Sequence, residues 1–566
     1  MRWMTALAVV VALGGCSAAP LRADTILFNG KVFTANDAQP WAQALAIFGD
    51  RVVAVGDSAA IQALAGPSTR RLDLGGRTVV PGFNDAHQHI EITPPATDLV
   101  LPDEPTLAQL ESAIKTALAS APAGQLLRGI IGQTAWGDPV LSRDWLDAIA
   151  RTTPVWLTGF TGHGVMLNSA ALALVDITDS VKEIEGGRLG RDAQGRLNGR
   201  LEETAGEWAE RLLAIKAGPA AAAARYRAVA AEALGYGITT IQLMADPLPI
   251  AETGKRLVEA NSPIRWKAYR FPMRAAGGET IDSRPTLPPQ PTARIDLRGM
   301  KWIIDGTPIE RLAYMKEPYA DAPDTSASAR PNAGELRRDP AVAVSDREGR
   351  GRLNLPQSRI DEFVGWAYGS EDPLLVHAIG DAALDAYLTA LEKTGRPEVW
   401  RAKRPRIEHG DMLSDDLLTR VKALGVVVAV NPFHFMFPDV YLARLGPARQ
   451  AWMMPVKAML ERGIPVAIGS DGPMNPFMNV LWAATHAANP SQALTREQAV
   501  TAYTRGSAFA EFTERDKGQL AVGMLADLAV LSADLFTATP GQIPAITSVL
   551  TMVGGKPVHD AGVIRP

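Results

Sequence analysis

The chain has 566 residues, of which 47% are apolar and 21% charged, and its formal net charge is −4 at pH 7. This composition is ordinary for a globular protein, and the length favours one large domain with a smaller companion. Nucleic acid has no electrostatic support as a partner, and no apolar run beyond the N-terminus is long enough to predict an internal membrane span.

Residues 1–23 have the features of a secretory signal: one early arginine, an apolar stretch, and then small residues. Cys16, the only cysteine, closes the run LGGC, which resembles the lipobox of bacterial lipoproteins, where the cysteine is lipidated. Ser17 replaces the aspartate that usually retains such proteins at the inner membrane. We therefore expect an exported, periplasmic protein anchored to the outer membrane through Cys16. Ordinary cleavage after Ala23 is the alternative, and either route leaves no disulfide.

The two ends of the remaining chain have a similar texture. Residues 24–82 contain short β-branched and aromatic runs separated by Asn-Gly and Gly-Asp turns, which indicates a meander of antiparallel strands. Residues 511–566 contain comparable runs, LADLAVL and ITSVLTMV among them. These patterns predict that both ends pair into one small β domain, with 24–82 as its N-terminal part and 511–566 as its C-terminal part.

The middle of the chain, residues 83–510, alternates helical patterns such as DAALDAYLTALEKTG with short apolar runs such as ITTIQLM and VVVAVNP. Repeated alternation of helix and buried strand is typical of a parallel α/β fold, and its length fits a (β/α)₈ barrel with insertions. Active sites of such barrels lie at the carboxyl ends of the strands. Residues 310–355, rich in Pro, Ala and Ser, are predicted to form a long loop near the barrel mouth, a candidate lid.

Six polar residues that stand in or beside these apolar runs are candidate functional residues. His87 and His89 are one residue apart, so on a strand their imidazoles point to the same side. The others lie further along the chain: Lys301 in KWIIDGTP, His377 in PLLVHAIGD, His409 in RIEHGD and Asp471 in VAIGSDGP. Each alone has an ordinary structural explanation, but four independent coincidences become less credible together. If the barrel forms, all six residues could face one mouth.

The chain resembles the amidohydrolase superfamily, specifically its amidohydrolase-3 branch of YtcJ-like metal-dependent hydrolases. The resemblance covers essentially everything after the signal and is carried in order by VVPGFNDAHQH, TGHGVMLNSAAL, GITTIQLM, HAIGDAAL, RIEHG, SDGPMNPF and KGQLAVGMLADLAVL. It implies a TIM-type (β/α)₈ metal-dependent hydrolase barrel flanked by a small β-sandwich built from both chain ends.

The resemblance also implies roles for the six residues. It assigns two histidines to each of two divalent ions, His87 and His89 to the more buried ion and His377 and His409 to the other. Lys301 would bridge the ions once CO₂ has carboxylated its ε-amine, and an unmodified Lys301 would leave a single-metal site. Asp471 would bind the first ion and move protons. These donors suit two Zn²⁺ ions, and Fe²⁺ or Mn²⁺ are accepted by the same ligand types.

Three more side chains are candidate substrate contacts by the same resemblance: Trp136, His163 and His434. Relatives commonly have Asp-Gly-His where this chain has Thr161-Gly162-His163, so an acidic contact is missing at that point. The two remaining histidines, His486 and His559, are expected to be structural or exposed.

The expected function is hydrolysis of an amide or another non-peptide C–N bond of a small molecule by a metal-activated hydroxide, with Asp471 as the proton carrier. Ester, lactone or carbamate hydrolysis at the same site stays open. A catalytically inactive, lipid-anchored binding protein also stays open, although the complete set of six residues argues against it. Ring deamination is a minor option, because HAIGDAAL offers Asp381 where deaminases need a glutamate. Oligomeric assembly is left open.

Overall fold

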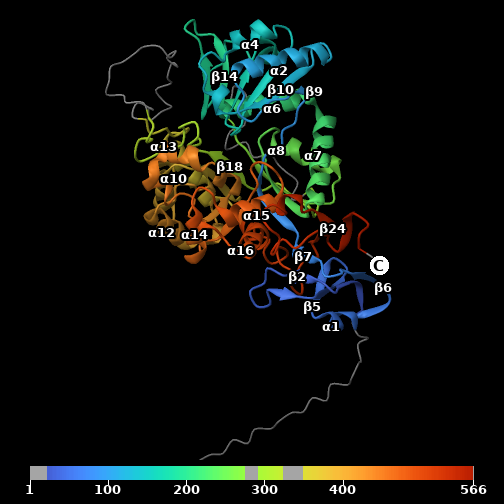
Figure 1. The fold of residues 1–566 in the computed structure, drawn as a ribbon. Coiled ribbons are helices and arrows are strands. Elements are labelled where there is room, and N and C mark those ends of the chain that lie inside the picture. The colour runs from blue at the N-terminus through green and yellow to red at the C-terminus, as the bar shows by residue number, and fades with distance from the viewer. Residues whose placement is uncertain (1–21, 274–290, 323–348, 565–566) are drawn as a thin grey trace, which may run out of the picture.

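The computed structural model describes residues 22–273, 291–322 and 349–564. Residues 1–21 of the predicted signal, Cys16 among them, and residues 323–348 of the predicted loop lie outside the described residues. The described flanks of that loop, 310–322 and 349–355, contain no helix or strand. Figure 1 shows three parts: an upper lobe, a central barrel, and a small β domain beside the C-terminus. Within the described ranges, no helix is both long and apolar enough to cross a membrane.

The central part is a parallel barrel, as the alternation of helix and strand predicts. In sheet order, the described residues form eight barrel strands: β8 (Phe83–Gln88), β15 (Ile238–Ala245), β16 (Arg265–Arg270), β18 (Met300–Ile303), β19 (Leu374–Ala378), β20 (Arg406–His409), β21 (Val427–Val430) and β22 (Val466–Ile468). Consecutive strands pair in parallel. Every residue of β15 and of β19 to β22 is buried, because helices cover the outer face of the barrel and side chains fill its interior.

Amphipathic helices cover the barrel (Figure 1). They include α7 (Pro219–Gly235), α8 (Ile250–Ala260), α9 (Gln357–Gly369), α10 (Asp381–Thr394), α12 (Asp415–Leu424), α14 (Val456–Glu461) and α15 (Pro476–Thr485). Helix α8 illustrates the pattern, since its buried residues Ile250, Thr253 and Leu257 recur every three or four positions. This spacing places one apolar stripe against the strands and leaves the charged side chains in water.

The upper lobe is inserted between β8 and β15. It contains a six-stranded sheet in the order β13 (Gly187–Arg191), β14 (Leu197–Glu203), β12 (Gly164–Leu167), β11 (Val155–Gly159), β10 (Leu126–Ile131) and β9 (Ala96–Asp98). Three of its helices are α2 (Leu107–Ser120), α4 (Arg143–Ile149) and α6 (Thr204–Ala217). The sequence predicted insertions in the barrel but not this sheet. Its strands are short, and the paired strands β12 and β14 are separated in the chain by a helix and another strand.

The small β domain contains two sheets. One has the order β5 (Arg51–Gly56), β4 (Ala44–Phe48), β1 (Ala23–Phe28) and β6 (Ala65–Asp73). The other has the order β25 (Lys556–Asp560), β24 (Ser548–Val553), β23 (Leu528–Leu531), β7 (Thr78–Pro81), β2 (Lys31–Phe33) and β3 (Trp41–Ala42), so the two chain ends meet where β7 pairs with β23.

The predicted antiparallel meander is wrong at two pairings in this domain. β1 pairs with β6, and β2 pairs with β7, in parallel. Between β1 and β6 the chain passes through other strands and the short helix α1 (Ser58–Gln62), and this crossover returns it in the same direction. Turn residues in the sequence predict only local chain reversals, so they do not predict a parallel pairing between strands this far apart.

Hydrogen bonds and one close backbone approach join the first barrel strand, β8, to the last, β22, and so close the barrel. The Asp85 carboxylate, at the middle of β8, accepts hydrogen bonds from the backbone N–H and the hydroxyl of Ser470 at 2.8 and 2.6 Å. Asp471 N–H donates to the carbonyl of His87 at 2.9 Å. Gly469 lies so close that an added Cβ would be 2.4 Å from the Cβ of His87. This close approach brings the ends of β8 and β22 together at the barrel mouth.

We predict that Gly469→Ala destabilises the protein and lowers its metal content, because the new methyl group pushes β22 away from His87. Thermal unfolding and metal analysis of the purified variant check this. Gly365→Ala in α9 is the matched control, since its added Cβ meets no atom within 4 Å. A Gly469→Ala protein that keeps the wild-type unfolding temperature and metal content would contradict the proposed closure.

Candidate metal centre

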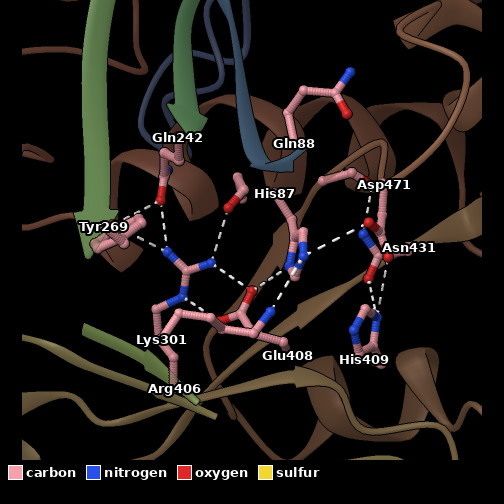
Figure 2. Close-up of polar contacts among 12 residues, drawn as sticks. His87, Gln88, Gln242, Tyr269, Lys301, Arg406, Glu408, His409, Asn431 and Asp471 are labelled. Carbon is pink, nitrogen blue, oxygen red and sulfur yellow. Dashed lines mark hydrogen bonds and ion pairs between the residues drawn. The ribbon is translucent and has the colours of Figure 1, made fainter. Parts of the chain in front are cut away.

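All six predicted ligands come together at one end of the barrel. Figure 2 shows four of them, His87, Lys301 and His409 on three different strands and Asp471 just after β22. His87 Nε2 is central: it lies 3.2 Å from His89 Nε2, 3.3 Å from Lys301 Nζ and 3.6 Å from Asp471 Oδ1. Two nitrogens bound to one tetrahedral Zn²⁺ at about 2.0–2.1 Å would lie about 3.3 Å apart. The spacing of these donor atoms therefore fits joint binding of one ion.

His377 and His409 lie on the other side of Asp471. Their rings are 4.4 Å apart between centroids, and Asp471 Oδ2 is 3.6 Å from His409 Nδ1. His377 Nε2 is buried and has no hydrogen-bond partner among the described residues. It lines a cavity of about 50 Å³ with His409 and Asp471. An unpartnered ring nitrogen is costly to bury, so this position also fits a bound cation.

Three partners that the sequence analysis missed orient the histidines through Nδ1. His87 Nδ1–H donates to Glu408 at 2.6 Å, and His409 Nδ1–H donates to the Asn431 side-chain oxygen at 2.8 Å. His89 Nδ1 lies 3.2 Å from Asp246 Oδ1. Such contacts fix ring orientation and tautomer, which leaves Nε2 as the donor to a metal. Glu408 and Asp246 carried a usable signal, because each stands in or directly after an apolar run.

A second acidic group adjoins this centre. His89, Glu207 and Asp246 each offer one ligand atom within 4.8 Å of the others, as do His87, His409 and Asp471. Burial raises the pKa of Glu207 well above its ordinary value, and Asp246 adds to this effect. A raised pKa favours the neutral, protonated form of Glu207, so this carboxyl keeps its proton more readily than an exposed glutamate does.

A buried ion pair supports Glu408 (Figure 2). Arg406 donates to both Glu408 oxygens at 2.9 and 2.8 Å and to Gln242 Oε1 at 2.6 Å, and both charged side chains are 0% exposed. Burial alone would raise the pKa of Glu408, but Arg406 lowers it to about 2. Glu408 is therefore an anion whose geometry is set before any ligand arrives.

The backbone at two ligands is unusual. Glu408 and His409 are neighbours on β20, and neighbouring side chains of a regular strand point to opposite faces. His409 instead has φ 73°, and Asp471 has φ 43°. Both lie in the left-handed region, which residues other than glycine seldom adopt and which often marks functional sites. This conformation lets Glu408 and His409 both serve the same centre.

Burial sets the protonation states of the ligands. It lowers the pKa of His87 to about 4, and it lowers the pKa values of His377 and His409 well below the ordinary range. These imidazoles are neutral at pH 7 and keep a lone pair for a metal. Burial also lowers the pKa of Lys301. Burial would raise the pKa of Asp471, but the surrounding basic groups, His87 first, lower it.

Two of the three candidate substrate contacts lie beside this centre. His163 Nδ1 is 3.2 Å from Glu203 Oε2, and although burial opposes it, Glu203 raises the pKa of His163 to about 9. Thr161 stands where relatives commonly have an aspartate. Here the negative charge that acts on His163 comes from Glu203 and Glu310 instead. His434 Nε2 lies 3.8 Å from Asp471 Oδ2, with Nδ1 3.1 Å from Asp411.

Trp136 lies elsewhere. It is buried in the inserted lobe against Gly159 and Gly164, and it does not line the 50 Å³ cavity. The last two histidines are structural, as expected: His486 Nε2 contacts the carbonyl of Met454 at 3.0 Å, and His559 Nε2 contacts that of Ser548 at 3.1 Å. Six of the eight histidines in the chain thus surround one centre.

Comparison with known sequences decides the family. Residues 70–559 match the sequence profile described as "Amidohydrolase family" (Amidohydro_3). The chain belongs to the amidohydrolase family. This amidohydrolase is 28% identical over 526 residues to "Putative amidohydrolase YtcJ" of Bacillus subtilis (strain 168), covering 87% of this chain and 91% of the relative. It is 26% identical over 569 residues to "N-substituted formamide deformylase" of Arthrobacter pascens, covering 94% and 97%.

A solved structure shows that the amidohydrolase fold extends over nearly the whole chain. An uncharacterized metal-dependent hydrolase from Pyrococcus horikoshii OT3 superposes with a TM-score of 0.65 at 22% identity, covering 91% of this chain and 99% of that one. With the donor set described above, the family membership identifies the protein as a metal-dependent hydrolase that holds a divalent metal.

We predict that the stabilising effect of Glu408 depends on pH. Its pKa in the folded protein is about 2 against an ordinary value of 4.5, so its contribution is complete above pH 4.5 and is lost as the pH falls towards 2. In metal-free protein, Glu408→Gln should cost about 3–5 kcal/mol at pH 7, because Arg406 loses its buried partner. Urea unfolding of both proteins at several pH values should show the difference shrinking below pH 4.5.

Glu111→Gln is the matched control, because Glu111 pairs with Lys115 on the surface of α2. Its unfolding should match wild type at every pH. An equal and pH-independent effect of both substitutions would contradict the assigned role of Glu408.

Proposed function

We propose that this enzyme hydrolyses an amide or another non-peptide C–N bond of a small molecule, using two divalent ions, Zn²⁺ in the first place, bridged by carboxylated Lys301. The observation that carries the proposal is the position of Lys301. Its Nζ is buried at the barrel centre, 3.3 Å from His87 Nε2, at a place where an ammonium would repel any metal held by the histidines.

Carboxylation resolves this conflict of charge. Burial lowers the pKa of Lys301, which favours the neutral amine. The amine lone pair forms an N–C bond with CO₂, and one amine proton leaves, so the product is a carbamate anion with two oxygen donors. His87, His89 and Asp471 would then hold one ion, and His377 and His409 the other. The same donors accept Fe²⁺ or Mn²⁺.

Ions held in this way would polarise a substrate carbonyl and would lower the pKa of a bound water towards about 7. The protein's own side chains account for the remaining requirements. Asp471 is an anion between the two histidine pairs, placed to accept the proton of the attacking water and pass it to the leaving nitrogen. His163 is cationic at neutral pH, so its free nitrogen is suited to donate a hydrogen bond to the developing oxyanion.

A C–N bond is favoured over an ester for a chemical reason. An amine is a poor leaving group until it is protonated, whereas an alkoxide leaves more readily. The centre provides Asp471 and, 3.8 Å from it, His434 as proton-handling groups. The relative named N-substituted formamide deformylase, which this chain matches along 97% of that protein's length, supports an N-substituted amide as the substrate class.

We predict about two metal ions per chain in protein purified with bicarbonate, falling to one or fewer in Lys301→Ala. Metal analysis of both proteins, with wild type also prepared without bicarbonate, checks this. Lys267→Ala is the control, because Lys267 is a buried lysine of β16 that pairs with Asp296 instead. One ion per chain in both wild type and Lys301→Ala would contradict a metal bridge through Lys301. No metal in either protein would contradict the proposed metal-dependent hydrolysis. Paired amide and ester substrates would then distinguish the bond cleaved.

We also propose that residues 1–23 direct export and that Cys16 is lipidated, which places the enzyme in the periplasm on the outer membrane. The run LGGC and the serine after Cys16 support this assignment. Full-length protein expressed in a Gram-negative host should take up labelled palmitate and fractionate with the outer membrane, and Cys16→Ser should abolish the labelling. Unlabelled, freely released wild-type protein would favour ordinary cleavage after Ala23.

A further inference from the structure

A large second cavity opens above the metal centre. Its volume is about 1150 Å³, and both the inserted lobe and the barrel loops line it, the lobe with Leu101 and Ile130 and the loops with Phe433 and Trp482. Figure 1 shows the lobe facing this end of the barrel. Asp246 and Asp471 lie at the inner end of the cavity, so it leads directly to the metal centre.

The wall of this outer cavity is aromatic and continuous with the inner 50 Å³ cavity. Phe433 lies 5.2 Å from Phe437 and 5.6 Å from Trp482 between ring centroids, and Phe437 lies 5.9 Å from Phe160. Phe160, Phe433, Phe437 and Asp471 line both cavities. A substrate whose reacting carbonyl reaches Asp471 therefore has its remaining atoms against aromatic rings.

Apolar side chains in the outer cavity are accessible to a ligand. Ile130 is 64% exposed and Met436 is 37% exposed, and both line the cavity. Large apolar side chains that converge on one concave, exposed surface are typical of a site for an apolar ligand. A ligand with an elongated hydrocarbon or aromatic group would bury the most apolar surface against these walls.

The charged residues of the outer cavity are nearly all acidic. Glu91, Asp98, Asp103 and Glu104 line its outer part, and Arg128 is the only cationic side chain among the described lining residues. Arg128 is already paired, since Nε contacts Asp98 at 2.5 Å and Nη1 contacts Glu91 at 3.2 Å. A carboxylate entering this cavity would lose its water and, among the lining residues that the structure describes, meet no unpaired cation.

Resting on the hydrolase function proposed above, we propose that the outer cavity is a substrate subsite for an elongated apolar group that is neutral or cationic. It excludes substrates whose distal end carries a carboxylate. The inserted lobe thus selects the substrate by size and charge, while the barrel carries the metal centre.

Hydroxamates, which chelate metals through their head group, separate the two sites. Wild type loaded with Zn²⁺ is titrated calorimetrically with acetohydroxamate, phenylhexanohydroxamate, and hydroxamates of the same chain length that end in an amine or a carboxylate. The phenyl compound should bind at least about tenfold more tightly than acetohydroxamate, because its tail buries several methylenes. The carboxylate compound should bind more weakly than both the phenyl and the amine compounds.

Ile130→Lys supplies a gain-of-binding test, because it adds a cation to an exposed wall position. It should raise the affinity for the carboxylate compound about fivefold and leave acetohydroxamate unchanged. Val140→Lys is the matched control, since Val140 is 55% exposed but does not line the cavity. Its affinities should equal those of wild type.

Equal affinities for all four hydroxamates, or tight binding of the carboxylate compound to wild type, would overturn the subsite. If acetohydroxamate does not bind but phenylhexanohydroxamate does, the result would count against the metal centre. Binding of the phenyl compound would then support the subsite independently. If neither compound binds, both the subsite and the proposed function are overturned.

Discussion

The buried ion pair between Arg406 and Glu408 underlies the whole centre. Two fully buried charges are tolerated only when each is completely paired. Here the remaining guanidinium donors bond to Gln242, the Tyr269 hydroxyl and the backbone carbonyl of Ala86. Glu408 Oε2 accepts hydrogen bonds from both Arg406 Nη2 and His87 Nδ1. His89, Lys301 and Asp471 each have a donor atom within 3.6 Å of His87 Nε2, so the position of the metal depends on this pair.

Barrel closure supplies the second constraint. The ligands belong to strands that are far apart in the sequence, and they meet only because β22 returns to β8 through Gly469 and the Asp85–Ser470 hydrogen bonds. The left-handed backbone at His409 and Asp471 then turns their side chains inwards. Strain at these two residues is opposed by the surrounding barrel, whose strands are buried on both faces.

The inserted lobe and the barrel divide the work between them. The barrel mouth concentrates neutral imidazoles, a buried amine and an aspartate, which suit a metal but distinguish substrates little. The outer cavity carries apolar walls and acidic residues, and Asp471 at its inner end joins it to the metal centre. Selection by the lobe can therefore vary without disturbing the chemistry at the barrel mouth, as expected where loops and insertions surround one end of a barrel.

The sequence by itself determined the parallel α/β barrel and the six candidate ligands, because hydrophobic periodicity is local and each ligand stands in or beside an apolar run. Only the tertiary structure decided their partners. Glu408 is 321 residues from His87, and nothing in local spacing links Asp246 to His89. The parallel pairings of β1 and β2, the six-stranded sheet of the lobe and the outer cavity were equally hidden. Each depends on contacts between distant segments, and those contacts form only when the chain packs.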